Sequence, residues 1–180
     1  MAVNPQGDIA WFSPDPRAII PLDERFHIPH GLRRVLKKQQ FKITFDTAFG
    51  PVIRGCAKAH GSTWISREII RSYSQLHKLG FAHSVEVWSD QGGTGKAELV
   101  GGLYGVHIGG AFFGESMFHT ATDASKVALV ALVERLRING FLLLDTQWTT
   151  PHLTRFGTYE IPKTAYMELL GKAIAMKHVF

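Results

Sequence analysis

The chain has very little cysteine: Cys56 is alone among 180 residues, so no internal disulfide can form and C-x-x-C zinc or redox motifs are excluded. It also lacks a long apolar run, because the longest, residues 127–133, is far short of the roughly 20 residues of a membrane-spanning helix. The first residues do not show a charged segment followed by an apolar core, so no signal peptide is predicted. We therefore expect a cytoplasmic protein without membrane contact.

Neither sign of charge dominates. Lys and Arg number 20 against 15 Asp and Glu, a net charge of +5, and hydrophobic residues make up 45% of the chain. This composition predicts a globular domain with a sizeable core rather than a disordered chain. The mild basic excess permits a polyanionic partner without requiring one. No heptad pattern is present, so a coiled-coil assembly is not expected and we expect a monomer.

Two patterns that could carry chemistry do not meet the requirements for it. The glycine-rich run at residues 92–96 is not a P-loop, since Asp90 stands where the first glycine is needed and Ala97 replaces the Ser or Thr. We expect a surface hairpin loop there. The nine histidines are scattered without an H-E-x-x-H motif, so we predict no metal site and no cofactor. Cys56 is interpreted as a small core residue.

Hydrophobic periodicity predicts the order of elements. Residues 1–31 are expected to be loop-like because prolines recur at positions 5, 14, 16, 21 and 29. Helices are predicted over 32–38, 48–59, 67–79, 123–139 and 163–176, with a helical turn at 152–156, and strands over 41–45, 83–88, 97–108, 111–118, 141–145 and 159–161. An antiparallel meander followed by a helix and a further strand predicts a mixed α/β (α+β) fold, compatible with an acetyltransferase-like (GNAT-type) sandwich.

Three polar residues lie within apolar strands. Glu115 is in the middle of one predicted strand, and Asp145 and Gln147 lie two apart at the end of another, where alternation would point them to the same face. A carboxylate in an apolar sheet is costly without partners, so these groups belong either to a hydrogen-bond network or to a reaction site.

A basic cluster is made of Arg33, Arg34, Lys37, Lys38 and Lys42. It is either a solvated helix face or a surface that contacts phosphates.

An ordered set of motifs resembles one enzyme family. The motifs are WFSPDPR at 11–17, GSTWI at 61–65, HSVEVW at 83–88, LVGGLYG at 99–105, GESMF at 114–118, DASK at 123–126 and LDTQ at 144–147. In this order they resemble the leucyl/phenylalanyl-tRNA–protein transferases. The resemblance implies an acetyltransferase-like fold and transfer of Leu, Phe or Met from aminoacyl-tRNA to the N-terminal Arg or Lys of a protein. That product is a degradation signal.

The resemblance also implies roles for single residues and a domain division. Asp145 and Gln147 match the catalytic pair, and Glu115 matches a nearby active-site acid. From the chemistry of the reaction we expect the Gln147 side-chain oxygen to accept a hydrogen bond from the attacking amine, with Asp145 orienting the site and the proton relayed through Asp145 or a ribose hydroxyl. Leu103, Phe112, Phe113, Leu144 and Met117 match the pocket for the amino-acid side chain, Trp64 matches an adenosine-binding aromatic, and the basic cluster (Arg33, Arg34, Lys37, Lys38, Lys42) matches a tRNA-binding region. Family members usually carry a further N-terminal domain, so residues 1–15 would be its remnant and 16–180 the catalytic domain.

Two other functions remain open. An acyl-CoA-dependent N-acetyltransferase would share the fold, but the turn after Phe118 lacks the glycine-rich sequence that would hold a pyrophosphate. A non-catalytic tRNA-binding remnant would keep the basic cluster and lose turnover, although the retained acids argue against that.

Overall fold

The structure is a computed structural model that describes the chain except residues 1, 4–8, 11, 60–63 and 91–94. The predicted hairpin loop at 92–96 therefore lies mostly outside the described residues. The strands are β1 (Ala2–Val3), β2 (Ile9–Ala10), β3 (Arg17–Ile20), β4 (Lys42–Phe45), β5 (Ala82–Ser89), β6 (Glu98–Ile108), β7 (Ala111–His119), β8 (Leu143–Gln147) and β9 (Tyr159–Ile161). The helices are α1 (His30–Lys37), α2 (Phe49–Ala59), α3 (Arg67–Lys78), α4 (Ala124–Ile138), α5 (Pro151–Thr154) and α6 (Lys163–Ile174).

A seven-stranded sheet organises the described part of the chain, in the order β4-β5-β6-β7-β8-β3-β9. Neighbours pair antiparallel except β7 and β8, which are parallel and are connected through α4. Strands β1 and β2 form a separate two-stranded pair. The mixed α/β class and the largely antiparallel sheet predicted from the sequence are confirmed.

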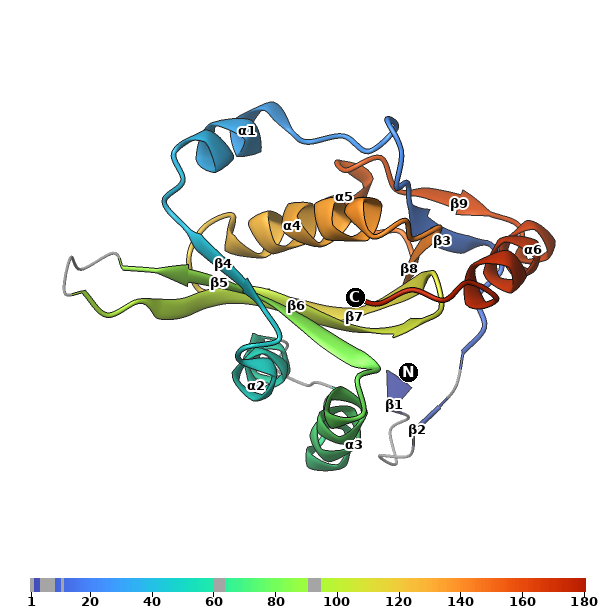
Figure 1. The fold of residues 1–180 in the computed structure, drawn as a ribbon, viewed down its shortest axis with the longest axis horizontal. Coiled ribbons are helices and arrows are strands. Elements are labelled where there is room, and N and C mark those ends of the chain that lie inside the picture. Colours follow the sequence, from blue (N-terminus) through green and yellow to red (C-terminus); the bar gives the residue numbers. More distant parts are fainter. Residues whose placement is uncertain (1, 4–8, 11, 60–63, 91–94) are drawn as a thin grey trace.

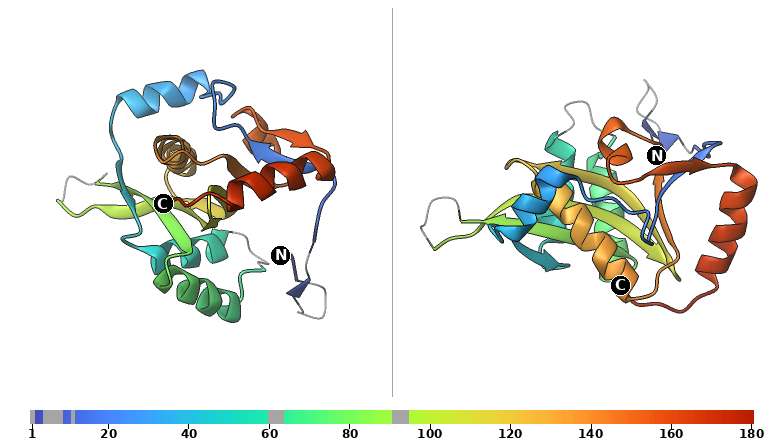
Figure 2. Two further views of the ribbon diagram at one scale, coloured as in Figure 1. Left: turned by 45° about the vertical axis from the view of Figure 1, so that its right-hand side comes forward. Right: turned by 90° about the horizontal axis from the view of Figure 1, so that it is seen from above.

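Helices cover both faces of the sheet. Helix α4 crosses one face and α1 lies on its outer side, while α2 and α3 pack on the opposite face (Figures 1 and 2). Helix α3 begins as expected, since the Ser66 hydroxyl accepts a hydrogen bond from the backbone N–H of Ile69, and Gly80, with φ of +79°, follows its end. Within the described ranges, no helix combines the length and the apolar character that crossing a bilayer requires.

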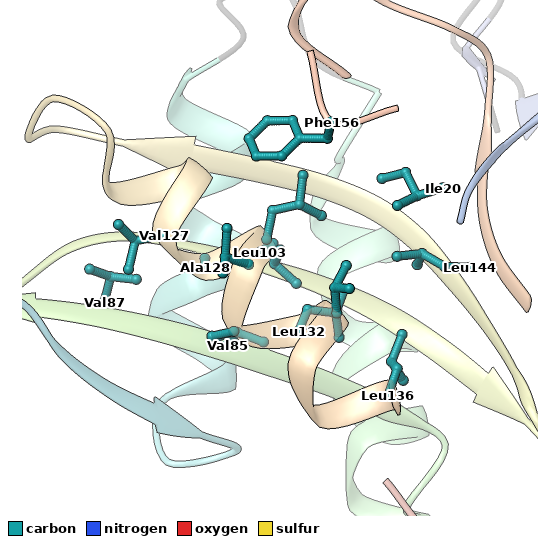
Figure 3. Close-up of a cluster of buried hydrophobic side chains, with 14 of the residues drawn as sticks. Ile20, Val85, Val87, Leu103, Val127, Ala128, Leu132, Leu136, Leu144 and Phe156 are labelled. Atoms are coloured by element: carbon teal, nitrogen blue, oxygen red, sulfur yellow. The ribbon is translucent and has the colours of Figure 1, made fainter. Parts of the chain in front are cut away.

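The largest core cluster fills the space between α4 and the sheet. Helix α4 is buried around most of its circumference, as its apolar sequence predicts. Figure 3 shows Val127, Leu132 and Leu136 of this helix facing side chains of the central strands. A second cluster lies under α2 and α3, and a third joins β3, β8 and α6.

The prediction of a loop throughout residues 1–31 is wrong at β3. Residues 17–20 pair with both β8 and β9, and Ala18, Ile19 and Ile20 are buried. Proline cannot donate to a strand ladder, but Pro16 and Pro21 flank this segment rather than interrupt it. The short run Arg-Ala-Ile-Ile between them is free to form a strand inside the sheet.

The sheet opens between its two parallel strands. β7 and β8 are in register only from Ala111 opposite Leu143 to Phe113 opposite Asp145. Each strand is irregular beyond this point: Glu115 is an extra residue in β7 against β6, and Thr146 is an extra residue in β8 against β3. Such bulges bend a strand and redirect its side chains. β7 continues to His119 beside β6 while β8 stays with β3, so an opening forms between them.

Candidate active site

A cavity of about 800 Å³ occupies this opening. Its wall comes from β6, β7, α4, β8 and α5, together with Trp64 and the end of α2. A cavity of this size, mostly apolar with a few convergent polar groups, is typical of a ligand site.

One side of the cavity is apolar. Its wall contains Leu103, Met117, Leu129, Leu132, Leu144 and Leu153. Three of these, Leu103, Met117 and Leu144, were expected from the sequence, and the structure brings them together. The leucines from α4 and α5 were not predicted, because the sequence pattern of their helices indicated only packing in the hydrophobic core. The only signal for them is that α4 is apolar on more sides than a surface helix needs.

Phe112 and Phe113 are not part of the cavity wall. Phe112 is completely buried and stacks on Phe180, with ring centroids 5.3 Å apart. Phe113 packs against the cluster formed by β3, β8 and α6. In the β6–β7 ladder Phe112 stands opposite His107 and Phe113 opposite Val106, in the part of β7 that precedes the bulge, whereas the cavity wall on this strand begins at Gly114. The assignment of these two residues to the pocket is therefore corrected.

Asp145 lies outside the cavity wall, at the centre of a buried network. Its side chain is 0% exposed. Arg17 donates to both carboxylate oxygens, with Nε 3.1 Å from each and Nη2 2.6 Å from Oδ2. The Tyr166 hydroxyl donates to Oδ2 over 2.8 Å, and the backbone N–H of Gln147 donates to Oδ1 over 2.8 Å. These bonds make Asp145 an anchor, because several strong hydrogen bonds and an ion pair with Arg17 hold its side chain in place.

Gln147 lines the cavity and sits in an unusual turn. Its φ is +63°, in the left-handed region, and the backbone N–H of Trp148 donates to the carbonyl of Thr146 over 2.7 Å. An i to i+2 bond around a residue with positive φ is a classic γ-turn, a rare and strained conformation. Strain of this kind persists only where surrounding contacts enforce it. Asp145 supplies such a contact by accepting the N–H of Gln147.

Glu115 is the acidic residue of the cavity wall in the described part of the chain. Burial raises the pKa of this carboxyl, while a hydrogen bond with the Tyr73 hydroxyl opposes the change. Glu115 is on β7 and Gln147 is on β8, the two strands between which the cavity lies. The acid and the amide therefore stand on opposite sides of the opening.

Comparison with known proteins places the chain in a family. The leucyl/phenylalanyl-tRNA protein transferase family model matches residues 19–171. Curated relatives with the name leucyl/phenylalanyl-tRNA–protein transferase are 56% identical in Akkermansia muciniphila, over 97% of this chain and 88% of the relative, and 56% identical in Herpetosiphon aurantiacus, over 99% and 90%. The chain belongs to the leucyl/phenylalanyl-tRNA–protein transferase family. This confirms the family and the enzyme class, an aminoacyltransferase, that the motifs suggested.

A solved structure is also similar. AAC(6')-Iy in complex with the bisubstrate analog CoA-S-monomethyl-acetylneamine aligns with a TM-score of 0.42 and 12% identity, over 78% of this chain and 92% of that one.

The remaining residues suggested by the resemblance to the transferase family occupy two places. Trp64 is partly buried and lines the cavity. The basic cluster lies elsewhere: Arg33, Arg34, Lys37 and Lys38 are exposed on and just after α1, and Lys42 is exposed at the start of β4. None of these five residues lines the cavity. Helix α1 lies on the outer side of α4, so α4 separates it from the cavity. We call the four α1 residues the basic face.

The donor set of the described residues does not form a metal site, since no three His, Cys, Asp or Glu side chains gather in a way that could hold an ion. His152 lines the cavity, and its Nε2 is buried. Burial, and then the nearby charge of Lys126, lower the pKa of His152 and favour the neutral imidazole.

Proposed function

We propose that the cavity holds the ester-linked residue of leucyl-, phenylalanyl- or methionyl-tRNA, and that the chain transfers this residue to the N-terminal amine of proteins that begin with Arg or Lys. The observation that carries the proposal is the position of Gln147. Its amide lies at the edge of an apolar cavity, where the sheet opens. The product would mark its carrier for degradation, and a tRNA-dependent reaction of this kind belongs in the cytoplasm.

The enzyme needs to supply little covalent chemistry, because an aminoacyl ester is already activated. The acceptor nitrogen attacks the ester carbonyl, the new C–N bond forms, the bond to the ribose oxygen breaks, and the proton lost by nitrogen ends on that oxygen. Holding amine and ester in contact supplies several kcal/mol of the barrier. We assign to the side-chain oxygen of Gln147 a hydrogen bond from the attacking amine, which orients the nitrogen lone pair towards the carbonyl.

Asp145 then acts as a positioning residue. Each of its oxygens already accepts bonds from Arg17, Tyr166 or the Gln147 backbone, which leaves little capacity to take a proton. Its function is to hold the γ-turn that presents Gln147. This assignment differs from a proton relay through Asp145, which the motif alone would also have allowed.

The leucine-rich wall accounts for donor selection. Leu, Phe and Met side chains branch at Cγ or not at all, so they can enter the apolar part of the cavity. Ile and Val branch at Cβ, and their extra methyl group would clash with the wall there. Discrimination on the scale of one methylene is worth about 1–3 kcal/mol. Trp64 is suited to stack on the terminal adenine, and the basic face to contact phosphates of the acceptor arm.

The decisive experiment is transfer of labelled Phe from Phe-tRNA to a peptide with N-terminal Arg. We expect Gln147→Ala to lose at least 100-fold in turnover, in line with the loss of a group that orients reactants. Gln75→Ala, which removes an exposed amide on α3, is the matched control and should transfer normally. Binding of tRNA without transfer by the wild type would favour a tRNA-binding module. Saturable binding of coenzyme A would favour an N-acetyltransferase.

A further inference from the structure

Two of the enclosed polar atoms that lack a protein partner lie in the cavity wall. In the part of the chain that the structure describes, three buried side-chain nitrogen or oxygen atoms have no hydrogen-bond partner, on Tyr104, Arg135 and His152. Tyr104 and His152 line the cavity, and the Tyr104 side chain is 0% exposed. A buried hydroxyl without a partner destabilises a fold, so its retention beside a cavity points to a group of the ligand as its partner.

Tyr104 and Glu115 lie on neighbouring strands of the cavity wall. Tyr104 stands opposite Ser116 in the β6–β7 ladder, directly beside the bulge that contains Glu115. Gln147 lies on the strand across the opening, β8. The phenol, the carboxyl and the amide therefore belong to three residues that line the same cavity.

The electrostatics of these residues favour a cation. Glu115 is the acid of the described cavity wall; it shares a hydrogen bond with the Tyr73 hydroxyl, and its charge acts on Tyr104. The rings of Tyr73 and Tyr104 meet edge to face, with centroids 5.4 Å apart. Burial and then the charge of Glu115 raise the pKa of Tyr104, so the hydroxyl stays protonated and neutral while its oxygen remains able to accept a bond.

We propose that the Tyr104 hydroxyl oxygen and the Glu115 carboxylate together bind the α-ammonium group of the ester-linked amino acid. The inference rests on the proposed function, since it assigns the polar end of the same donor site. The apolar wall holds the side chain of the residue, Gln147 faces its ester, and the ammonium group points to the phenol and the acid. Donors with an acylated amine are then rejected, because they carry no charge for Glu115 and add bulk in an enclosed place.

The test measures binding rather than transfer. One ligand is phenylalanine joined through a stable amide to 3′-amino-3′-deoxyadenosine, and the other is its 3-phenylpropionyl counterpart, identical except for the missing amino group. Titration calorimetry without acceptor gives both dissociation constants. For wild type we expect the amino ligand to bind at least tenfold more tightly at neutral pH, as a hydrogen-bonded charge should provide. Tyr104→Phe should reduce this ratio by roughly tenfold and leave the desamino ligand within twofold.

Two further variants keep the outcome clear. Tyr159→Phe removes a phenol outside the cavity wall and should keep the wild-type ratio. Glu115→Gln keeps the side-chain shape and should reduce the ratio even if Tyr104→Phe fails to fold. Equal loss for both ligands in Tyr104→Phe, or equal affinity of both for wild type, overturns the inference. The inference is also overturned if Tyr104→Phe keeps the wild-type ratio of the two dissociation constants but no longer prefers an Arg-peptide to an Ala-peptide as acceptor. Tyr104 and Glu115 would then bind the acceptor rather than the donor. Selective binding without transfer would contradict the proposed function and leave this inference standing.

Discussion

Replacing Asp145 by Asn tests whether this carboxylate is an anchor or a reacting group. The substitution keeps the size of the side chain and removes its charge. Arg17, whose side chain is 14% exposed, would then have no counter-charge, and Tyr166 and the Gln147 backbone would compete for one remaining acceptor oxygen. Breaking a buried ion pair from one side costs about 3–5 kcal/mol, because the other charge stays buried and uncompensated. For a chain of this length each kcal/mol lowers the melting temperature by roughly 2–4 °C.

We therefore expect Asp145→Asn to melt roughly 6–20 °C below wild type in calorimetry, and to lose transfer because the γ-turn at Gln147 relaxes. Tyr166→Phe removes one bond to the same carboxylate and should melt a few degrees lower. In a double-mutant cycle the two losses should be clearly less than additive, since both act on one network. A melting temperature within about 1 °C of wild type, together with abolished transfer, would refute the anchor role and place Asp145 among the groups that touch the reacting atoms.

Four other outcomes follow from the same structure. Replacing all four residues of the basic face by Ala should weaken tRNA binding and flatten its dependence on salt, and an unchanged salt slope would argue against phosphate contact. Leu103→Trp should fill the apolar wall and lower Phe transfer well below Leu transfer, and undiminished Phe transfer would place the pocket elsewhere. Burial raises the pKa of the Cys56 thiol to about 12, so a thiol reagent should label it only after unfolding, and rapid labelling of the native protein would contradict its enclosure. Because the pKa of Glu115 is raised, donor binding should weaken as pH falls through that pKa and the carboxylate gains a proton, and Glu115→Gln should remove this acid limb.

The sequence predicted the regular elements because their patterns are local. The strands of the β5–β7 meander alternate or are bounded by glycine, and α4 contains the apolar run 127–133 between an acidic start and Gly140. β3 was not predicted, because the frequent prolines of this region were interpreted as a sign of a loop. Only two of these prolines adjoin the strand, one at each end. Position relative to the strand decides the effect of a proline, and that position depends on a pairing with residues more than 120 positions away.

Site geometry was predictable to a smaller extent. The polarity of Glu115, Asp145 and Gln147 inside apolar strands identified two residues of the cavity wall and one beside it. The division of labour among them depends on contacts distant in sequence: Arg17 reaches Asp145 across 128 positions, and Tyr166 approaches from α6. The position of Phe112 and Phe113 outside the cavity wall depends on where β7 and β8 separate, and the sequence pattern does not show that point.

The two bulges explain why the anchor and the cavity occur together. A parallel pair that stayed in register past Asp145 would bury Glu115 and Gln147 against each other and close the cavity. The extra residue in each strand turns β7 towards β6 and β8 towards β3, and the cost falls on Gln147, whose γ-turn is worth about 1–3 kcal/mol of strain. A hydrogen bond from its N–H to a charged acceptor is of similar size, about 1.5–3 kcal/mol. Arg17, Asp145 and Tyr166 therefore hold the turn at Gln147, the residue to which the proposed function assigns the bond from the attacking amine.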